Sequence, residues 1–242
     1  MNAQNYPMYE NPTRQALLPA PAPAPALRGG GAPLGKGPFA IVEALLKSPA
    51  SVLHELQSGR GALFQLSALV VVTMVVTGLV MATFSGGLQV LLVPLKLSLG
   101  IFFCALICLP SLHIFSCLAG AEQSVKETWG ALLMGVALMG ILLVGFAPVT
   151  WVFSQATSSS AFMGALHLIV LVISSMFGLG LIGRALTAMN RAPVRGTRLW
   201  SVLFVLVLFQ MTTTLRPLVG EAEGPVLGER LFFLTHWFRS LG

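Results

Sequence analysis

The side chains with the greatest chemical potential lie in one apolar run near the middle of the chain. They are Cys104, Cys108, His113 and Cys117. On a helix, Cys104 and Cys108 lie on neighbouring turns, and so do His113 and Cys117. Zinc and copper accept thiolate and imidazole ligands, and Pro110 could bend a helix toward a common centre. Unpaired cysteine, however, is also a common buried residue. We therefore expect these side chains to serve helix packing, with a metal site as the alternative.

Two histidines fall inside apolar runs. Ionisable residues within a membrane raise a functional hypothesis, so His113 and His167 could form a proton relay or hydrogen-bond between helices. The apolar runs contain no carboxylate that could pair with these histidines. Because proton-coupled transport normally uses such a carboxylate, we favour a role for both histidines in helix packing. In the last apolar run, Gln210 and residues 212–214 are typical of hydrogen bonds between helices.

The chain carries no recognisable catalytic motif. It lacks a Walker A sequence, H-E-x-x-H, G-x-S-x-G and paired carboxylates. The run Gly178-x-Gly180-x-x-Gly183 matches a dinucleotide fingerprint in its letters, but it lies inside an apolar stretch and does not follow a strand. The sequence therefore predicts a protein that is not an enzyme, with no catalytic, cofactor-binding or metal-binding residues.

Composition indicates that lipid surrounds much of the chain. Of the 242 residues, 55% are hydrophobic and 9% are charged, and the mean hydropathy is +0.85. Soluble domains carry roughly 25% charged residues, so this chain cannot cover itself with a wettable surface. The net charge of +6 comes from bases beside apolar runs. It indicates membrane orientation and contact with anionic lipid, and not binding to nucleic acid.

Five stretches are long enough to cross a bilayer, which takes about 20 residues. They cover residues 62–84, 88–118, 129–153, 161–183 and 199–215. The second stretch exceeds the required length, and Pro94 predicts that residues 88–93 lie shallow or re-enter while the span proper begins near Lys96. Tryptophans prefer the membrane surface, and three lie near the ends of these stretches: Trp129, Trp151 and Trp200. The predicted fold is an all-α polytopic membrane protein.

The rest of the chain flanks this membrane domain of residues 61–218. Residues 1–38 are rich in Ala, Pro and Gly, which predicts a disordered tail that acts as a linker or docks a partner. Residues 39–60 predict two amphipathic helices on the membrane surface, separated at Ser48-Pro49. Residues 219–242 contain ERLFFLTHWFRSLG, which predicts a C-terminal interfacial helix.

Orientation follows from the distribution of lysine and arginine. Ten of the fourteen bases fall on one side of the predicted membrane. These ten are Arg14, Arg28, Lys36, Lys47, Arg60, Lys126, Arg184, Arg191, Arg195 and Arg198. By the positive-inside rule the N-terminus is cytoplasmic and the C-terminus lies outside, in what we expect to be a bacterial inner membrane.

Small residues recur in the third and fourth stretches, where they let helices approach closely. Pairs four apart are Ser174 with Gly178 and Ala161 with Ala165, and Gly180 and Gly183 follow. The third stretch has glycines at five-residue steps, which rotate around a helix and define no single face: Gly130, Gly135, Gly140 and Gly145. Packing within the chain is the expected role and homo-oligomerisation the alternative. Pro110 and Pro148 predict kinks.

The pattern resembles the Yip family of Ypt/Rab-GTPase-interacting membrane proteins, especially its prokaryotic relatives. The residues that carry the resemblance are Lys47-Ser48-Pro49, the stretch PLKLSLGIFFCALICLPSLHIFSCLAG and the APV at 147–149, within residues 40–218. The resemblance implies a cytosolic tail, five spans and no catalytic residues. It also implies a scaffold or adaptor in membrane organisation or trafficking that works through protein partners. The alternative is a transporter or a membrane subunit of one, suggested by Pro94, Lys96 and the two histidines.

Overall fold

The computed structural model describes residues 39–59, 61–85, 89–120, 123–157, 159–190 and 196–214. All elements in these ranges are helices: α2 (Ala40–Lys47), α3 (Pro49–Gln57), α4 (Ala62–Ser85), α5 (Gln89–Leu118), α6 (Val125–Ala156), α7 (Ser160–Asn190) and α8 (Thr197–Thr214). The all-α fold class is thereby confirmed. The predicted tail at 1–38 and the predicted C-terminal helix at 219–242 lie outside the described residues.

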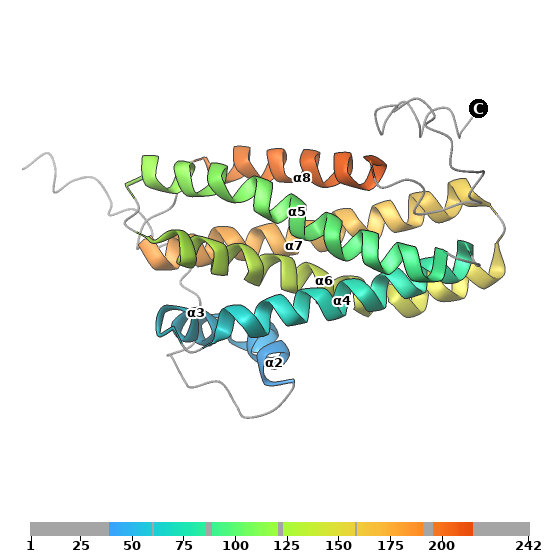
Figure 1. Cartoon of the computed structure of the whole chain (residues 1–242), viewed down its shortest axis with the longest axis horizontal. Coiled ribbons are helices and arrows are strands. Elements are labelled where there is room, and N and C mark those ends of the chain that lie inside the picture. Colours follow the sequence, from blue (N-terminus) through green and yellow to red (C-terminus); the bar gives the residue numbers. More distant parts are fainter. Residues whose placement is uncertain are drawn as a thin grey trace, which may run out of the picture.

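Four of the described helices, α4 to α7, are long and apolar enough to cross a bilayer. Their lengths of 24 to 32 residues correspond to about 36–48 Å, against a hydrocarbon thickness of about 30 Å. A shorter apolar helix, α8, follows them and includes Thr197–Met211. The long helices run side by side along the long axis of the molecule (Figure 1). The chain is an integral membrane protein.

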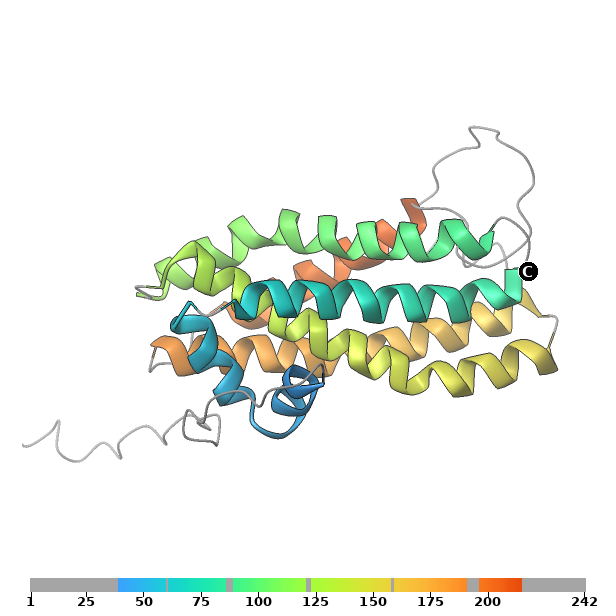
Figure 2. The ribbon, with the colours of Figure 1, turned by 60° about the horizontal axis from the view of Figure 1, so that its bottom comes forward.

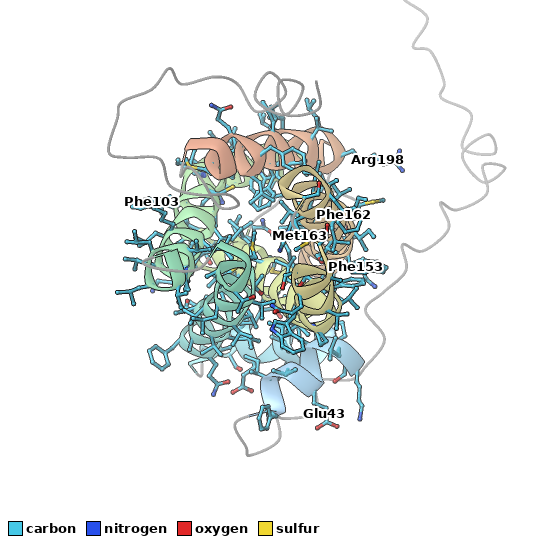
Figure 3. The ribbon with its side chains drawn as sticks, turned by 90° about the vertical axis from the view of Figure 1, so that its right-hand side faces the viewer. Glu43, Phe103, Phe153, Phe162, Met163 and Arg198 are labelled. Carbon is cyan, nitrogen blue, oxygen red and sulfur yellow. The ribbon has the colours of Figure 1, made fainter. Side chains whose placement is uncertain are left out.

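Helix α6 is the centre of the bundle. In the most apolar 18-residue window of each helix, the buried share is 56% for α6 and 33% for each of α4, α5 and α7. Helix α6 packs extensively on α4 and α7, while α4 also lies along α5 and α8 lies mainly on α5 (Figure 2). Figure 3 views the bundle along its length from the end where α6 passes to α7; there Phe153 and Phe162 stack edge to face at 5.6 Å between ring centroids.

The four glycines of α6 face different neighbours, which confirms that their five-residue steps define no single face. A β-carbon added to each would meet, in turn, Leu56 on α3, Gly178 on α7, Thr73 on α4 and, at Gly145, nothing within 4 Å. Three helices therefore approach α6 on three sides, each at its own glycine. Gly178 is one of the small residues for which the sequence leaves homo-oligomerisation as the alternative role. It already packs against α6 within the chain.

The predicted division of the second stretch is wrong. Helix α5 is continuous from Gln89, with Pro94 and Pro110 inside it, so no separate segment precedes Lys96. Proline removes one backbone donor, but it does not end a helix whose surroundings accommodate the ring. Gly78 of α4 provides that space, because a β-carbon there would lie 2.5 Å from the α-carbon of Pro94.

The largest differences from the predicted helix limits are at the start of α6 and the end of α7. Helix α6 begins at Val125 and not at 129, because Ser124 and Glu127 form a capping box before it. Helix α7 continues past Gly183 to Asn190. The buried face of α7 extends through this last part and holds it against the bundle, with Ala185 and Leu186 both fully buried.

The two short amphipathic helices are confirmed, with their break where the sequence places it. Helix α2 ends at Lys47 and α3 begins at Pro49, whose fixed backbone angle suits a first helical position. Both helices turn apolar side chains inward, including Leu45, Val52 and Leu56. They pack against α6, and α3 also contacts α4, so they belong to the folded bundle.

Candidate functional site: a hydrogen-bonded cluster at the basic end

Polar side chains gather at the end of the bundle where α5 and α7 end and α6 begins, on the left in Figure 1. We call it the basic end, since it holds Lys126, Arg184 and Arg198 among the described residues. Hydrogen bonds between separate helices are concentrated there, and they link α5, α6, α7 and the connection between α5 and α6.

The cluster is built around Gln123, which precedes α6. The Nδ2 of Asn190, 67 residues further along the chain, donates to the Oε1 of Gln123 at 2.9 Å and also to the carbonyl of Leu186 at 2.8 Å. The Nε2 of Gln123 donates to the Oγ1 of Thr128 at 3.1 Å. Gln123 is 9% exposed and Thr128 is fully buried, so these bonds replace water that neither group can reach.

The same network assigns the tautomer of His113. Thr128 Oγ1 has a single proton, which it donates to the carbonyl of Ser124 at 3.1 Å, and it already accepts from Gln123. His113 Nδ1 lies 3.1 Å from Thr128 Oγ1 and must therefore donate its proton to the second lone pair. The Nε2 of His113 is left with an open lone pair.

That lone pair faces a thiol. The Sγ of Cys117 lies 3.6 Å from His113 Nε2, one helical turn further along α5. Cys117 is exposed, whereas His113 is half-buried. A nucleophile, a base within hydrogen-bonding reach and a third group that orients the base are the elements of an activated nucleophile. The chemistry that this arrangement can perform is proton transfer from the thiol to the imidazole.

The predicted cysteine–histidine set is divided into two pairs. Cys104 and Cys108 are buried on neighbouring turns of α5, while His113 and Cys117 meet at its end. Among the residues that the structure describes, no group of three or more His, Cys, Asp or Glu side chains could hold a metal ion. The four side chains thus do not share one centre. Their arrangement does not support a four-ligand metal site.

The other predicted polar residues have separate surroundings. His167 Nδ1 bonds to the carbonyl of Met163 at 2.7 Å on its own helix, and its Nε2 is buried with no hydrogen-bond partner among the described residues. His113 bonds instead to Thr128 of α6, which is the hydrogen bond between helices that the sequence offers as one role for these histidines. The side chain of Gln210 is exposed, and those of residues 212–214 are outside the described set.

Trp200 lies near the start of α8, as the sequence predicts, but its ring faces the bundle and not its surroundings. Its ring is fully buried between α8 and α5, and its Nε1 donates to the carbonyl of Cys108 at 3.2 Å and to Ser111 Oγ at 3.1 Å. Phe204 packs beside it at 5.3 Å between ring centroids. No sequence spacing could reveal these contacts, because the bonded residues are about 90 positions apart.

Sequence reasoning missed Gln123, Thr128 and Asn190. Each is a polar residue at the edge of an apolar run, where the sequence alone cannot distinguish an interhelical bond from solvation. No protein-family model, no curated protein and no solved structure matches this chain. The resemblance to the Yip family therefore stays a prediction.

Proposed function

We propose that this integral membrane protein is a non-enzymatic scaffold or adaptor that binds a protein partner through α2, on the side of the bundle near the start of α4. The observation that carries the proposal is the arrangement of α2. This helix is held to the bundle through one face and leaves apolar and charged side chains on the other. A folded helix that presents an exposed face on the side of a membrane bundle is a suitable docking element for another protein.

The two faces of α2 are chemically distinct. Ile41 and Leu45 are 7% and 2% exposed, whereas Phe39 and Leu46 are 77% and 53% exposed. Exposed apolar patches rimmed by polar groups mark sites of interaction with a protein or a membrane. These helices lie against the side of the bundle near the start of α4 (Figure 2).

Charge favours a protein over an anionic membrane as the occupant. Glu43 lies among the exposed groups of α2 and pairs with Lys47 at 2.9 Å. The hydrogen bond and charge of the ammonium hold the pKa of the Glu43 carboxyl below its usual range, so it is ionised at neutral pH. Glu55 adds a second acid on α3. Surface helices that bind anionic lipid are rich in lysine and arginine, and this surface balances both signs.

Photo-crosslinking tests the proposal. A photoreactive residue replaces Leu46 in the full chain, and a matched control replaces Thr83, which is exposed at the opposite end of α4. We expect a discrete protein adduct from position 46 in native membranes and none from position 83. Lipid adducts alone at position 46, or equal protein adducts at both positions, would contradict a protein-docking role.

A charge substitution supplies an independent measurement. Leu46→Glu should abolish co-purification of the partner after gentle detergent extraction, because it places a carboxylate in the apolar part of the contact. The matched control is His54→Glu, at an exposed position on α3, which changes charge without removing an apolar contact. If the partner still co-purifies with both variants, the result would count against α2 as the docking element.

One observation favours the second candidate, a transporter or membrane subunit of one. Helix α7 buries two polar atoms, His167 Nε2 and Ser174 Oγ, that have no hydrogen-bond partner among the described residues. Buried polar groups of this kind line the paths of polar solutes in membrane proteins. Under this candidate, His167→Ala should abolish solute flux into proteoliposomes while His54→Ala retains it. Equal flux in both variants would exclude a path through His167.

A further inference from the structure

We propose that Cys117 is an acylation site: its thiol accepts a fatty acyl group from an acyl thioester, with His113 acting as its base. The proposal concerns a different side chain and a different chemistry from the docking surface on α2, and it does not depend on that surface. It rests on the orientation of His113, the exposure of Cys117 and the lipid-facing surface that leads to it.

The orientation of His113 is set from three separate parts of the chain. Asn190 of α7 fixes the amide of Gln123, since its Nδ2 can bond only to the oxygen. The Nε2 of Gln123 must then donate to Thr128, which obliges His113 Nδ1 to donate to the same oxygen. The basic nitrogen of the imidazole thus points to Cys117 Sγ, 3.6 Å away.

Cys117 differs in this respect from the two other cysteines. Cys104 is 0% and Cys108 is 4% exposed, and the carbonyl of Cys108 bonds to the buried Trp200 of α8. Cys117 is exposed and is the cysteine with an imidazole nitrogen within hydrogen-bonding distance in the described residues. An electrophile in the surroundings can therefore reach this thiol while the bundle remains folded.

The surface beside Cys117 suits a fatty acyl chain. Apolar side chains form an exposed stripe along α5 that ends beside the thiol: Phe103 at 54%, Ile107 at 54%, Ile114 at 58% and Leu118 at 79% exposed. Figure 3 shows Phe103 pointing away from the other helices. An acyl chain attached at the end of this stripe can lie along it within the bilayer. Cysteines next to membrane-spanning helices are common positions for such acylation.

The reaction balances without an oxidant or a reductant. Cys117 Sγ attacks the carbonyl carbon of the thioester, and His113 Nε2 takes the thiol proton. The new carbon–sulfur bond forms, the bond between the carbonyl carbon and the donor sulfur breaks, and the donor leaves as a thiolate. The imidazolium returns the proton to that thiolate, so the products are acylated Cys117, a free thiol and neutral His113.

The direct test uses the full chain in lipid nanodiscs and palmitoyl coenzyme A that carries a terminal alkyne. We expect label on the protein that neutral hydroxylamine removes, as it cleaves thioesters. Cys117→Ser should lose the label, while Cys104→Ser and Cys108→Ser should retain it. Equal labelling of Cys117→Ser and the unmodified protein would overturn the proposal.

A second test separates the base from simple exposure of the thiol. His113→Gln should slow acylation about tenfold or more at neutral pH, as expected when a general base is removed. The rates should converge at high pH, where thiols ionise without a base. Thr128→Val should behave like His113→Gln, whereas Thr128→Ser keeps the accepting oxygen and should keep the rate. An unchanged rate in His113→Gln, with the protein still folded by its thermal transition, would overturn the role of His113.

Discussion

Gly135 of α6 and Gly178 of α7 lie against each other through their backbones. A β-carbon added to either residue would come within 2.6 Å of the carbonyl oxygen of the other. Such contact between small residues lets two membrane helices approach closely, and it adds van der Waals and weak Cα–H hydrogen-bond energy that larger side chains would prevent. The crossing of the two longest described helices therefore depends on the absence of two side chains.

Alanine at either position should separate α6 from α7. We expect Gly135→Ala and Gly178→Ala each to lower the free energy of unfolding by about 1–3 kcal/mol, as overpacking of a close contact does. Gly145→Ala on α6 and Gly180→Ala on α7 are matched controls, since a β-carbon at either meets nothing within 4 Å. Thermal unfolding in detergent measures the difference. Controls that destabilise as much as the test variants would show that helical glycine itself, and not the crossing, is required.

Trp200→Phe should loosen α8 from α5. The substitution keeps most of the buried ring but removes the N–H that bonds to Cys108 and Ser111, which should cost about 1 kcal/mol of stability. Trp151→Phe is the control, because Trp151 is 50% exposed. The thermal midpoints of the two variants give the comparison, and a larger loss from Trp151→Phe would contradict the anchoring role of Trp200.

The bond between Asn190 and Gln123 should appear as energetic coupling. A double-mutant cycle of Asn190→Ala with Gln123→Ala should give a coupling energy of about 0.5–1.5 kcal/mol, because each single variant already breaks the shared bond. The pair Asn190→Ala with Ser58→Ala should be additive, since Ser58 is exposed and bonds only to carbonyls of its own helix in the described structure. Chemical unfolding of the four variants provides the energies.

The capping box sets the start of α6. Ser124→Ala and Glu127→Ala should each lower stability by about 1 kcal/mol, because each leaves a backbone N–H at the helix start without its partner. Lys126→Ala, at the exposed position between them, should change stability little. Hydrogen exchange of the first-turn amides reports the same effect locally, and unchanged exchange in Ser124→Ala would contradict the assignment of this cap.

The orientation predicted from the basic residues has its own test. A single cysteine at Thr157, in the connection between α6 and α7, should react with a membrane-impermeant maleimide added outside intact cells. A cysteine at Gly120, in the connection between α5 and α6, should react only after the membrane is opened. Both are placed in a background in which the three native cysteines are serine. The reverse result would place the basic end outside.

Apolar periodicity and length were sufficient to predict the helices of the bundle. The four long helices and α8 each overlap a predicted stretch, and the break at Ser48-Pro49 follows from the local preference of proline. Errors arose where tertiary contact overrides a local signal. Pro94 predicts a break, yet Gly78 on another helix leaves room for its ring.

The candidate site was much less accessible to sequence reasoning. His113 and Cys117 could be paired from their spacing on one helix, and the structure confirms that pair. The Ser124–Glu127 capping box was a readable signal in the sequence, and the predicted start at 129 overlooked it. Asn190 and Gln123 meet only because α6 and α7 return the chain to the same end of the bundle, which no local pattern encodes.

The position of α8 has a consequence for the order of events during synthesis. Trp200 bonds to a carbonyl 92 residues earlier in the chain, and ribosomes add about 5–20 residues per second. The face of α5 that receives the indole therefore waits about 5–20 s for its partner after it leaves the ribosome. During that interval the nascent chain has an unfilled position between helices, and insertion of α8 is the step that fills it.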